Sequence, residues 1–203
     1  FKFDHIRTKR QVGSTFKPFV YASAITFLGI SPCMKVTDQQ YSIVPGEANF
    51  GLINVWSPGN AEGKFSGKSM TLYEALKESR NSVSVYLMKQ LKSTRPVLEL
   101  VNNMGIDKSK VPAQPSICLG AADLTVMEMT GAYASFANNG TYVVPSFITK
   151  IEDKNGKIIY KNTSDEKQAL PADINYVMVD MLKYAVRGSA GFGGIKSEIG
   201  GKT

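Results

Sequence analysis

The chain has 203 residues, a length that suits one domain with a sizeable core, and its 43% hydrophobic and 20% charged residues are ordinary for a globular protein. No run of 18 or more apolar residues and no signal peptide is visible, so we expect no membrane-spanning helix within the sequence. The net charge of +7 comes from scattered lysines, without an arginine-rich stripe interleaved with aromatics, and we therefore expect a solvated basic surface and no nucleic-acid site.

Metal and histidine chemistry are also disfavoured. His5 is the only histidine and lies in a polar leader segment, which argues against a zinc site and leaves a Ser-His-Asp triad with one candidate. Cys33 and Cys118 have no C-x-x-C partner, so we expect small buried residues, with a disulfide as the alternative. The sequence starts at Phe1 and stops at Thr203 within a motif, and we expect it to belong to a longer protein. No metal or cofactor is expected.

The first candidate site residues lie where the first helix is predicted to begin. Residues 1–12 are predicted to form a strand or loop, and Gly13 allows a tight turn after them. Pro18 cannot donate a hydrogen bond to the carbonyl of Ser14, so the helix must begin near Ser14 with Pro18 in its first turn. Ser14 and Lys17 then share one helix face and can touch.

This pair suits nucleophilic catalysis. A serine hydroxyl becomes a strong nucleophile when a base removes its proton, and a lysine is such a base only when its amine is neutral. Burial and nearby positive charge lower a lysine pKa, and the helix dipole adds a small effect. Residues 16–28 are apolar on nearly every side, which predicts a buried helix that ends at Gly29. For Ser14 and Lys17 taken alone, the alternative is an ordinary capped helix start.

The second candidate motif follows a loop-rich segment. Residues 31–67 contain several Pro and Gly turn signals. Thr71, with Glu74 three residues later, predicts a capping box at a helix start, and an amphipathic stretch over 83–91 predicts the next helix. The tripeptide Ser79-Arg80-Asn81 falls between these helices, where a turn can present a hydroxyl and an amide together. A plain polar connection is the alternative.

The remaining chain predicts three helices and one hairpin. They are a helix over residues 94–104 that stops at Gly105, a helix from a cap at Asp123 or Thr125 to about Asn138, a hairpin over 141–161 that turns at Asn155-Gly156, and a helix from Pro171 to Arg187. Small residues precede Lys202 and Thr203 at the end of the chain. They would let a strand approach a ligand closely.

Three motifs occur in a fixed order, namely Ser14-x-x-Lys17, Ser79-x-Asn81 and Lys202-Thr203. S-x-x-K, S-D-N and K-T-G are the signature of penicillin-binding proteins and serine β-lactamases. The chain resembles that superfamily, and most closely the transpeptidase domain of class A, bifunctional penicillin-binding proteins. Further similar segments are Arg10 to Phe19, Trp56-Ser57-Pro58 with Asn60, Ala75-Leu76, Leu119-Gly120 through Leu124-Thr125, and Ala132-Tyr133 to Asn138-Asn139-Gly140. The resemblance covers essentially the whole chain.

The resemblance implies an α+β fold, in which an antiparallel sheet is flanked by helices and joined to a mostly helical subdomain. Residues 1–203 would form one partial transpeptidase domain. In the family, strands before and after this stretch complete the sheet, and the glycine of the third motif and one oxyanion donor follow it. We therefore expect a fragment that lacks its terminal strands and that, alone, is inactive or poorly folded.

The resemblance also implies roles for six residues. Ser14 is the acylated nucleophile, Lys17 is its base, and Ser79 relays a proton between the lysine and the leaving amine. The backbone amide of Ser14 supplies one donor to the oxyanion hole.

The other three residues bind the substrate. Asn81 is expected to hydrogen-bond the peptide backbone of the substrate. Lys202 contributes positive charge and Thr203 holds the terminal carboxylate of a stem peptide that ends in D-Ala-D-Ala. A carboxylate needs a cation and a hydroxyl donor, so these residue types suit the task.

The implied function is an acyl-serine D,D-transpeptidase that cross-links peptidoglycan and is acylated by β-lactams. It would act on the extracytoplasmic side of the bacterial membrane, anchored by a segment outside this sequence. Its partners would include lipid-linked precursors, and the full-length protein would also carry a peptidoglycan glycosyltransferase domain. A D,D-carboxypeptidase, which transfers the acyl group to water, and a non-enzymatic penicillin sensor are the alternatives.

A β-lactamase is disfavoured by two features. Glu99 and Asn103 match the E-x-x-x-N pattern of class A β-lactamases, but they fall inside a short predicted helix soon after Ser79. Arg80 also stands where the β-lactamase motif has an aspartate. We therefore interpret the E-x-x-x-N match as chance.

Overall fold

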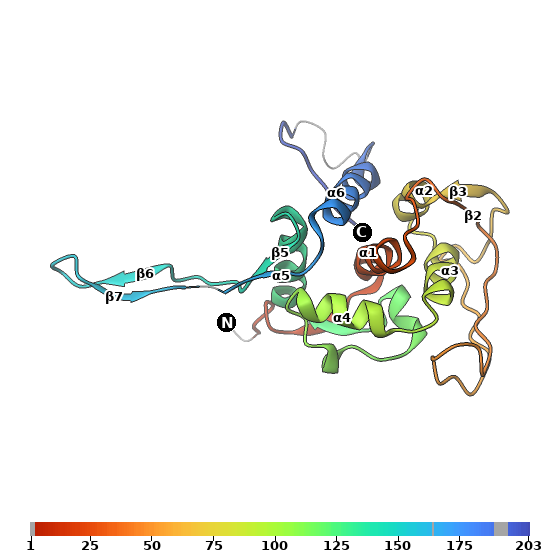
Figure 1. Ribbon diagram of the computed structural model, residues 1–203, viewed down its shortest axis with the longest axis horizontal. Helices are drawn as coiled ribbons and strands as arrows, with labels where there is room; N and C mark the ends of the chain where they lie inside the picture. The colour runs from red at the N-terminus through yellow and green to blue at the C-terminus, as the bar shows by residue number, and fades with distance from the viewer. Residues whose placement is uncertain (1–2, 164, 189–194) are drawn as a thin grey trace.

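The computed structural model describes residues 3–163, 165–188 and 195–203, and one helix lies at its centre (Figure 1). This helix, α1 (Lys17–Leu28), packs against α3 (Asn81–Leu91), α4 (Arg95–Asn103) and α6 (Ala172–Val186). Every residue of α1 from 17 to 25 is buried. A helix that is apolar on all sides can lose its exposure to water only in such a central position. The predicted buried helix is confirmed, and Pro18 lies in its first turn.

Two glycines bring backbone segments into close contact just before α1. Strand β1 (Lys9–Gln11) leads to a short 3-10 helix, η1 (Gly13–Phe16), and pairs antiparallel with β4 (Asp123–Thr125). Gly120 has φ +80°, and a Cβ at this position would lie 1.9 Å from the carbonyl oxygen of Gly13. Only a glycine lets the two backbones approach this closely.

The second and third helices of the chain follow the loop-rich segment. Strands β2 (Lys35–Thr37) and β3 (Ser69–Thr71) pair antiparallel, and α2 (Leu72–Lys77) starts directly after β3. Thr71 and Glu74 form the predicted capping box, in which each side chain bonds the backbone of the other residue. Residues 78–80 connect α2 to α3, so the predicted turn is confirmed for Ser79 and Arg80, whereas Asn81 is the first residue of α3.

The next stretch is helical and closes over the start of α1. Helix α4 is followed by two 3-10 turns, η2 (Lys108–Lys110) and η3 (Pro115–Leu119), and then by β4 and α5 (Val126–Ala137). The N-cap of α5 is Thr125, which forms a capping box with Glu128. Of the two predicted caps, Thr125 is therefore correct, and Asp123 belongs to β4.

The predicted hairpin projects away from the rest of the molecule (Figure 1). It consists of β6 (Lys150–Glu152) and β7 (Ile158–Lys161), paired antiparallel around the Asn155-Gly156 turn. At its base, β5 (Thr141–Val143) pairs with β8 (Glu166–Gln168), a strand that the sequence patterns did not predict. α6 follows and ends near Gly188, as predicted.

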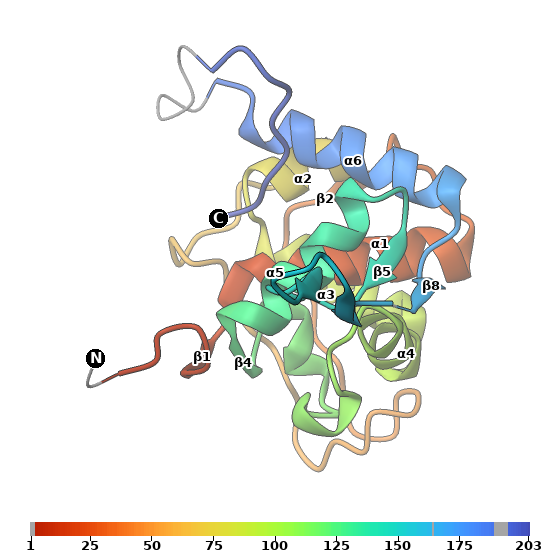
Figure 2. The same cartoon turned by 90° about the vertical axis from the view of Figure 1, so that its left-hand side faces the viewer.

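The α+β class is confirmed. In the described ranges, the strands pair as four separate two-stranded antiparallel sheets. Residues 195–203 contain no strand, although a strand was expected before Lys202. This segment instead runs along α6, and the backbone N–H of Gly201 donates to the carbonyl of Leu182 over 3.2 Å. Figures 1 and 2 both show its end beside the start of α1. Since a helix cannot extend a ladder, the segment has no strand partner there.

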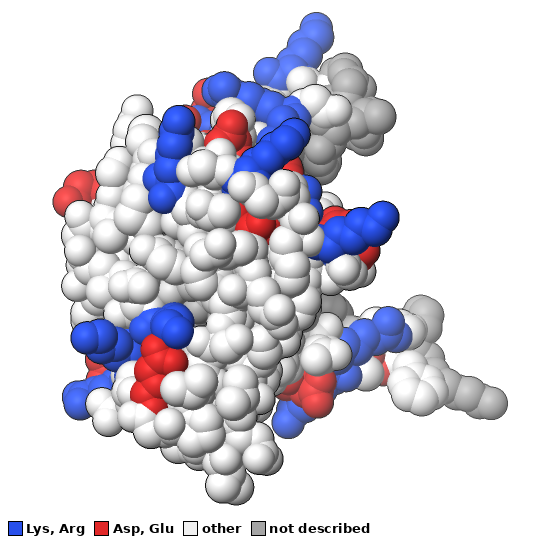
Figure 3. Space-filling model, turned by 90° about the vertical axis from the view of Figure 1, so that its right-hand side faces the viewer, with Lys and Arg blue, Asp and Glu red and all other residues white. Residues whose placement is uncertain are grey.

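Three further expectations meet the structure here. Cys118 is buried as expected, but Cys33 is exposed, and both thiols are free, so the disulfide alternative is wrong. Across residues 3–163, 165–188 and 195–203, no helix is both long and apolar enough to span a membrane. On the face shown in Figure 3, lysines and arginines form separate groups, several of them beside acidic residues.

Candidate active site

A buried lysine amine is the centre of the candidate site. Lys17 is fully buried at the start of α1. Its Nζ donates to the backbone oxygen of Ser79 at 2.5 Å, and it lies 3.2 Å from Ser79 Oγ and 2.7 Å from Asn81 Oδ1. Among the described residues, no carboxylate lies within ion-pair distance of this amine. Neutral oxygens alone hold it in place.

The surroundings of this amine lower its basicity. Burial lowers the pKa of Lys17 to about 7, and the positive charge of Lys202 acts in the same direction. Cys118 and Glu62 oppose the shift and are outweighed. A large fraction of the amine is therefore neutral near neutral pH. A neutral amine is the form that can accept a proton from a hydroxyl.

The turn between α2 and α3 presents two side chains to this amine. Ser79 has φ +56°, a left-handed conformation that is uncommon for residues other than glycine. The turn is held by hydrogen bonds from the backbone N–H groups of Ser79 and Arg80 to the carbonyls of Leu76 and Ala75. α3 starts at Asn81, so the hydroxyl of Ser79 and the amide of Asn81 face Lys17 together.

Ser14 lies one turn before the amine, in η1. Its backbone oxygen accepts a hydrogen bond from the N–H of Lys17, and its side chain is half-buried. The Ser14 hydroxyl makes no hydrogen bond with a described residue, because the Lys17 amine is directed to Ser79 and Asn81. The predicted placement of both residues at the helix start is confirmed. The hydroxyl–amine hydrogen bond is not formed, which leaves the hydroxyl free to meet a substrate.

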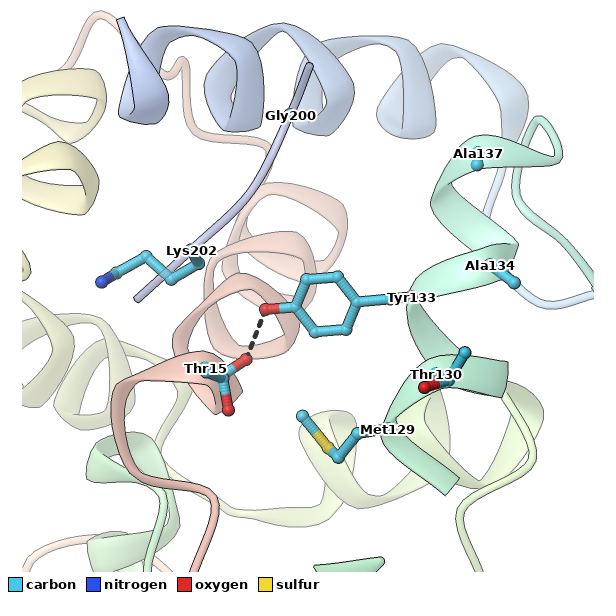
Figure 4. Close-up of a pocket in the computed structure, with 8 residues that line it drawn as sticks. All are labelled: Thr15, Met129, Thr130, Tyr133, Ala134, Ala137, Gly200 and Lys202. Atoms are coloured by element: carbon cyan, nitrogen blue, oxygen red, sulfur yellow. Dashed lines mark hydrogen bonds between the residues drawn. The ribbon is translucent and has the colours of Figure 1, made fainter. Parts of the chain in front are cut away.

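Lys202 of the third motif lines a cavity of about 550 Å³ beside the start of α1. Its lining residues are Thr15, Met129, Thr130, Tyr133, Ala134, Ala137, Gly200 and Lys202. The hydroxyl of Tyr133 donates to the backbone oxygen of Thr15 over 2.6 Å (Figure 4). The Lys202 amine points away from α5 and contacts the backbone oxygen of Thr203. Burial lowers the pKa of Lys202, and Thr203 is exposed.

The sequence patterns missed several residues that shape this site. Met129 and Tyr133 lie on a predicted helix to which the sequence patterns gave no role in the site, yet both line the cavity. Gly59 was placed in the loop-rich segment, yet its backbone oxygen accepts a hydrogen bond of 3.0 Å from Nδ2 of Asn81. The family-like segments around Trp56 and Tyr133 were the available signals for these positions.

The E-x-x-x-N match lies elsewhere in the molecule. Glu99 forms an ion pair of 2.6 Å with Arg95 on its own helix. With Ser23 and Phe27 it also lines a small cavity at the C-terminal half of α1, the opposite end of that helix from Ser14. Glu99 is therefore not placed to act on an acyl group at Ser14. In the described part of the chain, no cluster of three or more His, Cys, Asp or Glu side chains could hold a metal ion.

Comparisons with known proteins identify the family of the chain. The family model "Penicillin binding protein transpeptidase domain" matches residues 2–203. Penicillin-binding protein 1A of Neisseria meningitidis is 32% identical over 208 residues, which cover 98% of this chain and 25% of the relative. The chain thus spans about a quarter of the length of this curated relative.

Solved structures show the same fold. The crystal structure of penicillin-binding protein 1A from Haemophilus influenzae superposes with a TM-score of 0.79 at 25% identity, covering 94% of this chain and 32% of that one. PonA1 from Mycobacterium tuberculosis, solved in complex with penicillin V, gives a TM-score of 0.72 at 25% identity, covering 91% of this chain and 49% of that one. The chain belongs to the family of penicillin-binding protein transpeptidase domains.

Proposed function

We propose that this domain is an acyl-serine D,D-transpeptidase that cross-links peptidoglycan stem peptides ending in D-Ala-D-Ala and is covalently acylated by β-lactams at Ser14. The observation that carries the proposal is the buried Lys17 amine. It lies one helical turn from Ser14, bonds only neutral groups and has a pKa of about 7. Membership of the penicillin-binding transpeptidase family supports the same chemistry.

In the first half-reaction, the Ser14 hydroxyl attacks the carbonyl carbon of the penultimate D-Ala and gives its proton to the Lys17 amine. The peptide C–N bond breaks, and the terminal D-Ala leaves after it receives the proton through the hydroxyl of Ser79. Ser79 suits this relay because its Oγ lies 3.2 Å from the Lys17 amine. The product is an ester between Ser14 and the stem peptide.

In the second half-reaction, an amine of another stem peptide attacks this ester and loses its proton to Lys17. A new peptide bond forms, and the Ser14 oxygen leaves as the hydroxyl. If water attacks instead of the amine, the same site acts as a D,D-carboxypeptidase. This is the second candidate, and the half-buried, substrate-accessible position of Ser14 is compatible with both acceptors.

Substrate binding uses the remaining residues. Asn81 bonds the substrate backbone, and Lys202 with Thr203 binds the terminal carboxylate, since a cation and a hydroxyl donor suit that group. Lys202 lines the cavity beside the start of α1, which supports this assignment. When the terminal carboxylate of the substrate binds, its negative charge offsets the positive charge of Lys202 near Lys17.

The proposal extends to the whole protein. Peptidoglycan and its lipid-linked precursors lie outside the cytoplasmic membrane, so the domain acts on the extracytoplasmic side and is held there by a membrane anchor. A peptidoglycan glycosyltransferase domain in the same protein would supply the glycan strands. The curated relatives are about four times as long as the stretch they share with this chain, which leaves room for both parts.

Mass spectrometry of the full-length protein after incubation with benzylpenicillin tests the proposal. The expected adduct lies on the peptide that contains Ser14 and is absent from the Ser14→Ala variant. A stem pentapeptide with an added amine then separates the candidates: a cross-linked product indicates a transpeptidase, and release of D-Ala alone indicates a carboxypeptidase. Acylation without turnover of the pentapeptide would identify a penicillin sensor. No adduct on Ser14 would refute the proposal.

A further inference from the structure

Behind the site, a buried carboxylate joins the loop-rich segment to the start of α3. Asp38 is fully buried, although most aspartates are exposed. Its Oδ1 accepts hydrogen bonds from Ser82 Oγ at 2.6 Å and from Asn60 Nδ2 at 2.8 Å, and its Oδ2 accepts one from the backbone N–H of Ser66 at 2.8 Å. Arg80 Nη1 lies 3.7 Å from Oδ2.

These bonds keep the carboxylate charged. Burial alone would raise the pKa of Asp38, but the hydrogen bonds from Ser82, Ser66 and Asn60 outweigh it and lower the pKa to about 2. A charge that is taken out of water must be compensated by several partners of good geometry. Every oxygen of this carboxylate is used in that way, so its partners are held in fixed positions.

The same network also satisfies the N-terminus of α3. This helix has no side-chain cap of its own. Asn60 Oδ1 instead accepts a hydrogen bond of 3.1 Å from the backbone N–H of Ser82, in the first turn of α3. An acceptor from a distant segment thus replaces the usual N-cap, and the negative charge of Asp38 lies near the positive end of the helix dipole.

The network is one residue away from the candidate site. Asn60 and Ser82 are bonded to Asp38, and their neighbours Gly59 and Asn81 are bonded to each other over 3.0 Å. Asn81 in turn accepts from the Lys17 amine over 2.7 Å. The left-handed backbone of the preceding turn carries a strain that needs support from its surroundings.

We infer that Asp38 is a positioning residue for acylation: its buried carboxylate holds the turn over residues 79–81 so that the Ser79 and Asn81 oxygens face the Lys17 amine. Asp38 does not touch the substrate or the reacting atoms. This inference rests on the proposed function, because it concerns the acylation of Ser14.

The test measures the rate of acylation of the full-length protein by benzylpenicillin as a function of pH. In Asp38→Asn, an amide of nearly the same shape replaces the carboxylate. In the wild type, both oxygens of Asp38 accept hydrogen bonds. In the variant, an NH₂ group takes the place of one oxygen, and this group cannot accept a hydrogen bond. We expect acylation about 10- to 100-fold slower than in the wild type, as for a small misplacement of catalytic groups.

The pH profile separates positioning from a general loss of stability. When the Ser79 and Asn81 oxygens move, the ammonium form of Lys17 loses hydrogen bonds and its pKa falls below the wild-type value of about 7. The midpoint of the profile therefore moves to lower pH in Asp38→Asn. Lys202, Glu62 and Cys118, the titratable groups that act on the pKa of Lys17, are unchanged in this variant.

Asn175→Ala is the matched control. Asn175 is also buried and hydrogen-bonded, with its Nδ2 donating to the carbonyl of Phe136 over 3.0 Å, but it belongs to α6. When variants are compared at equal folded fractions, Asn175→Ala should keep the wild-type rate of acylation and the wild-type midpoint of the pH profile. Ser82→Ala, which keeps the carboxylate and removes its shortest hydrogen bond, should slow acylation by a smaller factor and serves as the test if Asp38→Asn does not fold.

The outcomes are distinguishable. If the wild-type protein is not acylated at Ser14, the proposed function fails. If the wild-type protein is acylated, the proposed function stands. The positioning role of Asp38 is then refuted if Asp38→Asn reacts at the rate of the Asn175→Ala control with an unchanged midpoint of the pH profile. Ser82→Ala takes the place of Asp38→Asn in this comparison if Asp38→Asn does not fold.

Discussion

The centre of the molecule and its hairpin are built from opposite kinds of contact. Around α1, residues far apart in sequence meet: the Lys17 amine bonds groups that are 62 and 64 residues away. In the β6–β7 hairpin, pairing is local, and both strands are exposed along their whole length. The candidate catalytic amine therefore lies in the part of the fold where long-range packing removes water, and this burial lowers its pKa.

The same difference appears in the side chains. At the centre, Phe19 packs against Phe136 and Tyr133 with ring centroids 5.7 and 5.6 Å apart, and it is fully buried. In the hairpin, Ile159 is 67% exposed. Substitutions at the centre should therefore cost more in stability or in reaction rate than substitutions in the hairpin. The following predictions test this contrast, from the largest effect to the smallest.

Lys17→Ala should give the largest effect. Loss of the general base should slow acylation by benzylpenicillin by about 100- to 10,000-fold, measured by mass spectrometry of the adduct over time. The fold should be retained, as judged by circular dichroism. The control is Lys89→Ala, since the Lys89 amine also bonds a backbone oxygen, that of Ser42 at 2.8 Å, but outside the site. Equal rates in the two variants would remove Lys17 from the role of base.

Gly120→Ala and Gly156→Ala compare the two regions at nearly the same φ, +80° and +81°. At Gly120, a Cβ would overlap the Gly13 carbonyl, and the combined clash and strain should lower the free energy of unfolding by about 3 kcal/mol. At Gly156, nothing lies within 4 Å, and the left-handed backbone alone should cost about 1 kcal/mol. Urea denaturation measures both. A larger loss at Gly156 would contradict the comparison.

Lys202→Met should shift the pH dependence of acylation. In the proposed mechanism acylation needs the neutral Lys17 amine, so its rate should rise with pH through the Lys17 pKa of about 7. The positive charge of Lys202 lowers this pKa, so its removal should raise the pKa and move the midpoint to higher pH. Rates of acylation between pH 5 and 9 check the shift. A midpoint that stays or moves down would show that the two amines do not interact.

Ile159→Thr should have the smallest effect. The exposed position of Ile159 on β7 predicts a change in the free energy of unfolding of no more than about 0.5 kcal/mol, and threonine suits a strand. The rate of acylation should equal that of the wild type. A clear loss of either would show that the hairpin is coupled to the centre, and that the contrast between the two regions is wrong.

Features that depend on neighbouring residues were predictable from the sequence. Pro18 and the apolar run after it located α1, the Thr71 capping box located α2, and Asn155-Gly156 located the hairpin turn. The placement of Ser79 and Arg80 in an inter-helix turn, directly before Asn81 at the start of α3, followed from the helices on either side. Each of these signals acts within a few residues.

Features that depend on distant partners were not predictable in the same way. β8 is a strand only because β5 lies beside it, and its composition of Glu, Lys and Gln gives no signal. Asp38 lies in a segment that the sequence indicates only as loop-rich, and no pattern near it predicts hydrogen bonds to Ser82 or Asn60. The direction of the Lys17 amine, toward Ser79 and Asn81, also depends on the distant turn.

The distance in sequence between Lys17 and the turn that holds its amine has a practical consequence. Neither η1 with α1 nor the α2–α3 pair contains all residues of the proposed reaction centre, so a chain that has formed its secondary structure but not docked these elements should not react with penicillin. Labelled penicillin would then stain only molecules with native tertiary packing. During refolding, the appearance of covalent label would report the moment at which the two segments meet, which makes the antibiotic a time-resolved sensor of assembly.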